Sequence, residues 1–190
     1  MKDEKLNGID TARMGQIVDA INNQPELAKF EFRAKNEWVG GGENHSTIRD
    51  FYGVGQEDKT RPEPFVFVAD EPTTLLGENK GANPVEFLLH SLAGCVTTTF
   101  VLHAAARGIH VQEIRSSLDG DIDLQGLLGL DENVTPGYQG IRFKMDVKAD
   151  CSDEELDDLL AYTAEHSPVC QSLRRPVPVT VERAVSAARD

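Results

Sequence analysis

Short alternations of apolar and polar residues dominate the first third of the chain, a pattern typical of half-buried β-strands. They cover residues 30–39, 46–52 and 64–69, and glycine-rich or charged segments separate them. We therefore predict an antiparallel meander in this region.

A short helix is predicted before the meander. Residues 11–22 repeat apolar side chains at helical spacing, and Asp10 is placed to cap the first turn. We interpret residues 1–28 as an N-terminal helical arm and residues 29–190 as the main domain.

The longest apolar segment predicts a helix from Pro84 to Arg107. Asn83 can cap it, Glu86 can complete a capping box, and Gly108 lies where a C-terminal cap belongs. At 1.5 Å per residue the helix is about 36 Å long. It is apolar almost all round, so it must be buried almost all round, by a second helix and by another subunit.

This segment nearly has the length of a membrane span, but it contains two histidines and three threonines and is closely flanked by charges. We interpret it as a core helix rather than as a membrane anchor. The charged residues 1–5 do not resemble a secretory signal. We expect a cytoplasmic protein.

The second half mixes strands and helices. The predicted elements are strands at residues 110–124 and 140–149, a helix from 153 to about 165, a short helix after Ser167-Pro168 and a closing strand at 177–185. The fold class is therefore α+β.

Acidic residues outnumber basic ones, 32 to 19, giving a net charge of −13. The densest basic spot is only Arg174-Arg175. Nucleic acid and anionic membranes would be repelled by this charge, so we expect neither as a partner.

The three cysteines are widely spaced and form neither a CxxC pair nor a zinc-type cluster. We expect no metal and no other cofactor. Cys95 lies midway along the apolar helix, where it is either core filler or a nucleophile. Cys170 lies in a first helical turn with Arg174 four residues on, an arrangement that favours a thiolate; simple packing remains the alternative. Cys151, among acidic residues, is read as incidental.

The string GANPVEFLL at residues 81–89, followed by LAGC at 92–95, resembles the signature of the OsmC/Ohr family. That pattern opens a central helix with G-x-N-P and places a cysteine twelve residues after the asparagine, as Asn83 and Cys95 do here. Residues 118–130 and 137–141 are also similar to the OsmC-like branch, and the resemblance extends over about residues 30–186.

The resemblance implies an OsmC-like two-layer fold, in which antiparallel sheets wrap long central helices in an intertwined homodimer. It also implies a thiol peroxidase that reduces organic hydroperoxides in the oxidative stress response. Cys95 would attack the peroxide and become a sulfenic acid, Cys170 is the possible resolving thiol, and a dithiol would be the reductant.

The sequence departs from the peroxidase pattern in three places. A Cys-Pro-x-Ser turn is replaced by Ser167-Pro168-Val169-Cys170, Val85 stands where the peroxidases have glutamate, and the early glycine turn lacks their arginine. Arg49 is the nearest candidate for that arginine.

Three hypotheses follow from these residues. The first is the peroxidase acting through Cys95 and Cys170. The second is a non-enzymatic dimer that binds a small apolar ligand at the subunit interface. The third is hydrolysis by a Cys–His pair, but the five histidines are scattered and neither His90 nor His103 is placed to pair with Cys95 within the helix.

Overall fold

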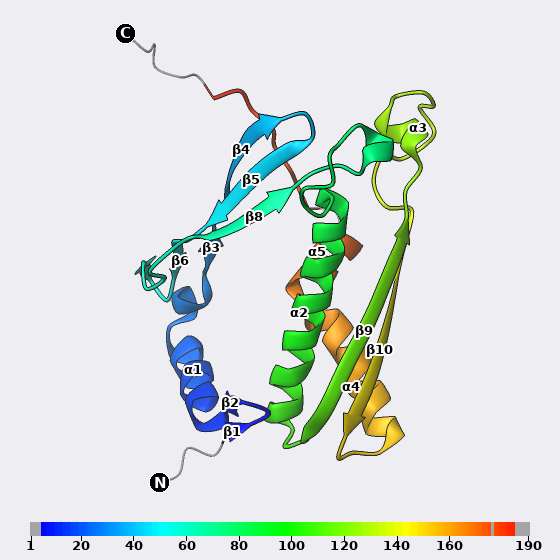
Figure 1. The fold of residues 1–190 in the computed structure, drawn as a ribbon. Helices are drawn as coiled ribbons and strands as arrows, with labels where there is room; N and C mark the ends of the chain where they lie inside the picture. Colours follow the sequence, from blue (N-terminus) through cyan, green and yellow to red (C-terminus); the bar gives the residue numbers. More distant parts are fainter. Residues whose placement is uncertain (1–4, 176, 185–190) are drawn as a thin grey trace.

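The computed structural model describes residues 5–175 and 177–184 (Figure 1). The helices are α1 (Thr11–Asn23), α2 (Pro84–Ala106), α3 (Leu124–Leu127), α4 (Asp153–His166) and α5 (Pro168–Arg174), with 3₁₀ turns η1 (Pro25–Ala28) and η2 (Thr73–Leu75). The strands are β1 (Lys5–Leu6), β2 (Ile9–Asp10), β3 (Glu31–Phe32), β4 (Lys35–Gly40), β5 (Glu43–Ile48), β6 (Phe51–Gly53), β7 (Gln56–Asp58), β8 (Phe65–Ala69), β9 (Val111–Asp121) and β10 (Gly140–Ala149).

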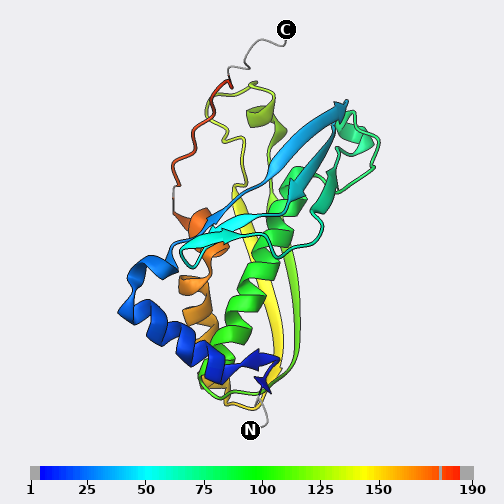
Figure 2. The same ribbon diagram turned by 90° about the vertical axis from the view of Figure 1, so that its left-hand side faces the viewer.

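Helix α2 runs through the middle of the molecule (Figures 1 and 2). The long antiparallel hairpin β9–β10 lies along one side of it, and α4 and α5 pack against it. The antiparallel sheet β4–β5–β8 lies near the N-terminal end of α2. The small sheet β3–β6–β7 lies beyond it, on the side away from α2. The fold is therefore α+β, as predicted.

The predicted caps of α2 are present. The Asn83 side chain accepts a hydrogen bond from the Val85 N–H at 2.8 Å, and the Glu86 carboxylate accepts one from the Asn83 N–H at 2.8 Å. Gly108 follows the helix with φ of +73°, a conformation that glycine adopts readily. The helix therefore begins and ends close to the predicted residues.

The best-packed part of the core lies at the C-terminal end of α2. Phe100, Ala104, Ile109 and Leu159 are buried there, and side chains of the β9–β10 hairpin and α4 surround them. The second helix that was predicted to cover α2 is thus α4.

The single chain does not bury α2 all round. The helix is long and apolar enough to span a membrane, yet only 22% of its most apolar 18-residue window is buried. The β9–β10 hairpin, α4 and α5 leave the rest of the helix uncovered, which agrees with the prediction that one chain cannot cover it. Burial of the remaining surface by another subunit stays a prediction.

The meander forms, but two of its predicted strands are broken. Residues 30–39 divide into β3 and β4, and residues 46–52 fall into β5 and β6. Both predicted strands are interrupted at the same level of the hairpin. As a result β4 pairs with β5, while β3 pairs with β6 in a separate sheet. Alternation of side chains does not record such a change of partner.

The predicted closing strand at residues 177–185 is wrong for residues 177–184, and Val185 lies outside the described residues. Val177, Val179 and Val181 alternate as in a strand but are 55%, 82% and 92% exposed. A strand also needs an edge to pair with, and none of the strands in the described part of the chain pairs with this segment.

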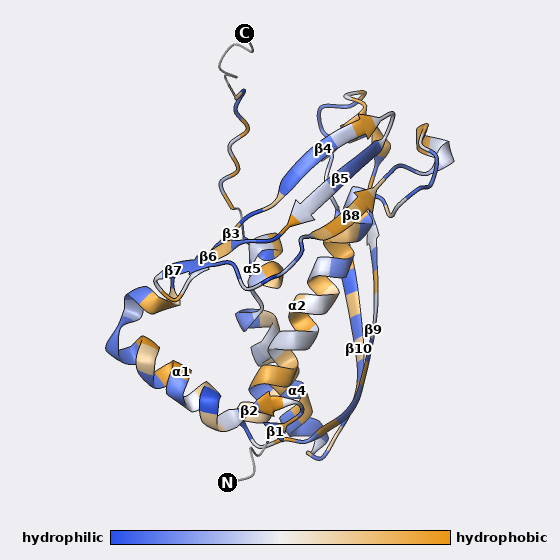
Figure 3. Cartoon of the chain, turned by 60° about the vertical axis from the view of Figure 1, so that its left-hand side comes forward, coloured by the Kyte–Doolittle hydropathy of each residue, from blue (hydrophilic) through white to orange (hydrophobic). Residues whose placement is uncertain are grey.

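The N-terminal arm is attached at the far end of α2. Asp10 caps α1 by accepting from the Arg13 N–H at 2.8 Å, as predicted. Asn7 fixes the preceding turn, since its side chain donates to the Ile109 carbonyl at 2.9 Å and accepts from the Val111 N–H at 2.8 Å. Helix α1 itself has no buried residue and stands apart from α2 (Figure 3).

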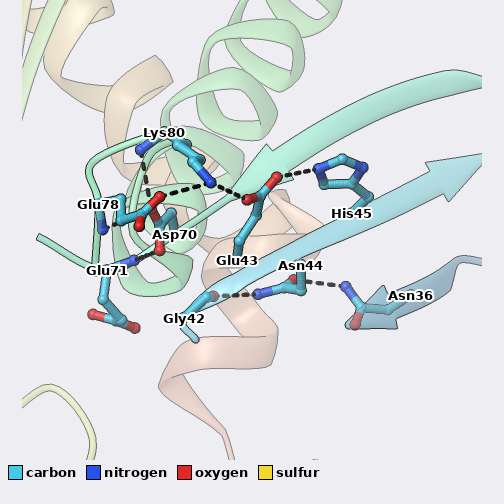
Figure 4. Close-up of polar contacts among 9 residues, drawn as sticks. All are labelled: Asn36, Gly42, Glu43, Asn44, His45, Asp70, Glu71, Glu78 and Lys80. Atoms are coloured by element: carbon cyan, nitrogen blue, oxygen red, sulfur yellow. Dashed lines mark hydrogen bonds and ion pairs between the residues drawn. The ribbon is translucent and has the colours of Figure 1, made fainter. Parts of the chain in front are cut away.

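A buried carboxylate organises the loop that leads into α2 (Figure 4). Asp70 is 2% exposed and accepts backbone N–H bonds from Glu71 at 2.8 Å and from Glu78 and Lys80 at 3.0 Å each. The Lys80 ammonium bridges the carboxylates of Glu43 at 2.8 Å and Glu78 at 2.7 Å. These bonds hold the segment that ends at the Asn83 cap.

We predict that Asp70→Asn lowers stability at neutral pH. The Lys80 backbone N–H, with those of Glu71 and Glu78, holds the pKa of Asp70 below its ordinary value. A lowered folded-state pKa stabilises the protein above the unfolded-state pKa of about 3.9, and this contribution is lost as the pH falls through the folded value. In urea unfolding at pH 7, the midpoint of Asp70→Asn should therefore be lower than that of the wild type. This difference in midpoint should become smaller in acid. Asp19→Asn, on the exposed face of α1, is the control, and an equal loss in both variants would contradict the prediction.

Candidate active site

Cys95 lies midway along α2, half-buried, with its sulfur against the junction of α4 and α5. Its Sγ accepts a hydrogen bond from the Ser167 hydroxyl at 3.2 Å and another from the Val169 N–H at 3.4 Å. The contact joins residues that are more than 70 positions apart in the sequence. Both donors are suited to a negatively charged sulfur.

The position of Ser167 is fixed by two helices. It follows α4, where its N–H donates to the Thr163 carbonyl at 2.9 Å, and it precedes α5, where its carbonyl accepts from the Gln171 N–H at 2.9 Å. Its side chain is fully buried. Pro168 starts α5 without needing a backbone donor, so the turn between the helices is short and well defined.

Ser167 was not predicted as a site residue, because the sequence pattern gave it only the role of a helix start. Its position in the turn that carries cysteine in the peroxidase pattern was the available signal. Buried and bonded to Cys95, it is part of the site.

Cys170 lies one helical turn beyond Ser167 and is also half-buried. In the described part of the chain its sulfur makes no hydrogen bond with Cys95. Arg174 is its neighbour, as the spacing predicted: the pKa of Arg174 is raised chiefly by its hydrogen bond to Glu165, with a smaller contribution from Cys170. The Arg174–Glu165 ion pair measures 2.5 Å.

A cavity of about 880 Å³ adjoins these residues. It lies between α2, β10, α4 and α5, above the packed core. Its wall is mostly hydrocarbon, and the residues that form it are Leu88, Leu92, Val96, Gly137, Tyr138, Gln139, Gly140, Ile141, Phe143, Met145, Leu160, Ala164, Cys170, Leu173 and Arg174. Leu92 and Val96, which neighbour Cys95 on α2, belong to this wall, and Cys170 is the cysteine that lines the cavity itself.

The other candidate side chains lie elsewhere. Arg49 donates to the carbonyls of Arg61 and Pro62 at 3.3 and 3.0 Å, in the outer part of the meander. Within the residues described, no arginine is bonded to Cys95. The Val85 carbonyl accepts a hydrogen bond from the Tyr138 hydroxyl at 2.9 Å, well away from the sulfur.

The histidines do not pair with Cys95 in the structure. His103 packs edge-on against Tyr162, with ring centroids 4.8 Å apart, and its pKa is lowered mainly by burial. His90 lines a separate pocket of about 460 Å³ beneath the β4–β5–β8 sheet. A Cys–His hydrolase site is therefore not assembled within one chain.

Cys151 packs at the edge of the core cluster at the C-terminal end of α2, and neither of the other two thiols belongs to that cluster. Across residues 5–175 and 177–184, no three His, Cys, Asp or Glu side chains are grouped so that they could hold a metal ion.

The family profile described as OsmC-like protein matches residues 77–182. Comparison with curated protein sequences finds no significant match. Among solved structures, the OsmC-like protein of Mycoplasma pneumoniae is similar to this chain with a TM-score of 0.57 and 17% identity, over 76% of this chain and 87% of that one.

A structure described as an organic hydroperoxide resistance protein, OsmC, from Legionella pneumophila is also similar, with a TM-score of 0.53 and 15% identity, over 75% of this chain and 90% of that one. At these identities the structures establish the common fold, and the profile covers more than half of the sequence. The resemblance noted in the sequence is thus confirmed, and the chain belongs to the OsmC-like family.

Proposed function

We propose that this protein is a thiol-dependent peroxidase that reduces organic hydroperoxides through Cys95. In the first step the Cys95 thiolate attacks the terminal peroxide oxygen, an S–O bond forms and the O–O bond breaks. The leaving alkoxide takes up a proton and departs as an alcohol. The cysteine is oxidised to a sulfenic acid, and two thiol equivalents later return it to the reduced form with release of water.

The contact between Cys95 and the α4–α5 junction is the observation that carries this proposal. A sulfur used only as core filler needs no polar neighbours, whereas this one receives two hydrogen bonds, one from a fully buried hydroxyl. Hydrogen bonds to an anionic form favour that form, and the thiolate is the nucleophile.

The adjoining cavity supports an apolar substrate. Its hydrocarbon walls favour the organic part of a hydroperoxide over hydrogen peroxide itself, because apolar surface gains free energy by leaving water. The side chains that flank Cys95 belong to that wall.

We also propose that the protein works as a homodimer in the cytoplasm, and neither in a membrane nor on nucleic acid. The exposed apolar side of α2 requires cover. A lipid bilayer is a poor cover, because α4 lies beside α2 and begins with the acidic first turn Asp153–Glu155. A second copy of the chain offers a matching apolar helix without this cost.

A second candidate function is binding of a small apolar ligand without catalysis. The cavity itself favours it, as does the lack of an arginine contact to Cys95 among the described residues. In that case Cys95 and Cys170 would only fill space, Cys170 in the wall of the binding pocket and Cys95 beside it on α2.

Replacing the nucleophile tests the choice between the two functions. Cys95→Ser should abolish reduction of cumene hydroperoxide in the presence of a thiol reductant, because the hydroxyl is too weak a nucleophile. Cys151→Ser, which alters a thiol at the other end of the core, should retain wild-type turnover. A wild type that binds an apolar fluorescent probe in the cavity but leaves hydroperoxide and thiols unchanged would favour the binding protein.

Removing the hydroxyl donor should slow the first step. A hydrogen bond to a charged group contributes about 1.5–3 kcal/mol, so Ser167→Ala should react with hydroperoxide about tenfold more slowly or worse in single-turnover measurements. Ser172→Ala is the matched control, because that hydroxyl donates to the Pro168 carbonyl at 2.8 Å on the exposed side of α5. If both variants react at equal rates and have unchanged unfolding midpoints, Ser167 does not contribute to the reaction of Cys95.

The proposed homodimer can be tested separately by measuring the mass of the protein in solution. Sedimentation should give twice the chain mass of 20.9 kDa. Leu102→Asp places a charge on the exposed side of α2, where Leu102 is 39% exposed, and should shift the protein toward the monomer. Leu76→Asp, at a loop position that is 92% exposed, should leave the mass unchanged. A wild type that stays monomeric at high concentration would contradict the proposal.

A further inference from the structure

The position next to the Cys95 sulfur is occupied by a hydroxyl group. An internal thiol that is to form a disulfide with Cys95 must approach to a Cα separation of about 4.4–6.8 Å with the two Cβ vectors converging. On the α4–α5 side the neighbour in contact is Ser167, 3.2 Å from the sulfur and fully buried. A hydroxyl cannot form a disulfide.

The Cys170 side chain lies in the wall of the cavity. The Val169 N–H, immediately before it, is itself bonded to the Cys95 sulfur, while the Cys170 side chain forms part of the cavity wall together with Leu173 and Arg174.

Helix α5 is also fixed from several directions. The Gln171 side chain donates to the Ala164 carbonyl at 2.8 Å, and the Arg175 N–H donates to the Gln171 carbonyl at 3.0 Å. These bonds hold the α4–α5 turn in the arrangement that places the Ser167 hydroxyl against the Cys95 sulfur.

From this geometry we infer that the Cys95 sulfenic acid is reduced by an external low-molecular-weight monothiol and not by Cys170. The inference rests on the proposed peroxidase function. The first monothiol attacks the Cys95 sulfur, its own proton and the sulfenic hydroxyl leave as water, and a mixed disulfide remains. A second monothiol attacks the sulfur of the bound monothiol, which frees Cys95 and releases the oxidised disulfide of the reductant.

Access favours a small reductant. The Cys95 sulfur is half-buried between α2 and the α4–α5 junction, so the active-site cysteine of a protein reductant would have to penetrate the fold. The neighbouring cavity of about 880 Å³ has room for a small thiol, and its wall includes Leu92 and Val96 beside Cys95 on α2. The dithiol that the family resemblance predicts is therefore not required.

Mass spectrometry of the full chain can identify the oxidation product directly. One equivalent of cumene hydroperoxide should add one oxygen atom at Cys95, and 2-mercaptoethanol should then give a mixed disulfide at that residue. Cys170→Ser should give the same two products as the wild type and as the control Cys151→Ser. Rapid formation of a Cys95–Cys170 disulfide in the wild type would overturn the inference while leaving the peroxidase proposal intact.

Ser167→Cys provides the converse test, because it places a thiol at the contact that the hydroxyl now makes. This variant should lose two hydrogens on oxidation, through a disulfide between positions 95 and 167, and the mixed disulfide with 2-mercaptoethanol should no longer accumulate. An unchanged sulfenic acid in Ser167→Cys would show that this contact does not control the product, which would also overturn the inference. No oxidation of Cys95 in the wild type would reject the peroxidase function and the inference together.

Discussion

The apolar surface of α2 is the constraint on which the rest of the structure depends. A helix that is apolar on all sides is stable in water only when other elements cover it, and this chain places the β9–β10 hairpin, α4 and α5 on one part of it. The same packing puts the α4–α5 junction beside Cys95. The contact that makes this cysteine a candidate nucleophile is thus a by-product of covering the helix.

The polar part of the site is small and is set into an apolar surrounding. The Cys95 sulfur has two donors, Ser167 and Val169, while the wall of the adjoining cavity is mostly hydrocarbon. In such surroundings each hydrogen bond acts more strongly than it would in water, and an apolar molecule is favoured over a hydrated one. This combination fits a reaction in which a sulfur attacks a peroxide that carries an organic group.

Ser167 stands at the turn where the peroxidase pattern carries a cysteine, and the difference matters for the proposed chemistry. Serine and cysteine are similar in size, and Ser167 fits the turn between two helices while still donating to the sulfur. A cysteine there could close a disulfide, whereas a serine can only stabilise charge. Cys170, one turn further, belongs to the cavity wall.

Local rules in the sequence determined much of this protein: the caps and limits of α2, the start of α1 at Asp10, the strand β10 and the family to which the chain belongs. These features depend on residues near one another, so they can be read in order along the chain. Only the tertiary structure decided that β3 pairs with β6, that residues 177–184 form no strand, and that the Ser167 hydroxyl bonds to the Cys95 sulfur. Each of those outcomes depends on which distant segments meet, and neither periodicity nor spacing records that.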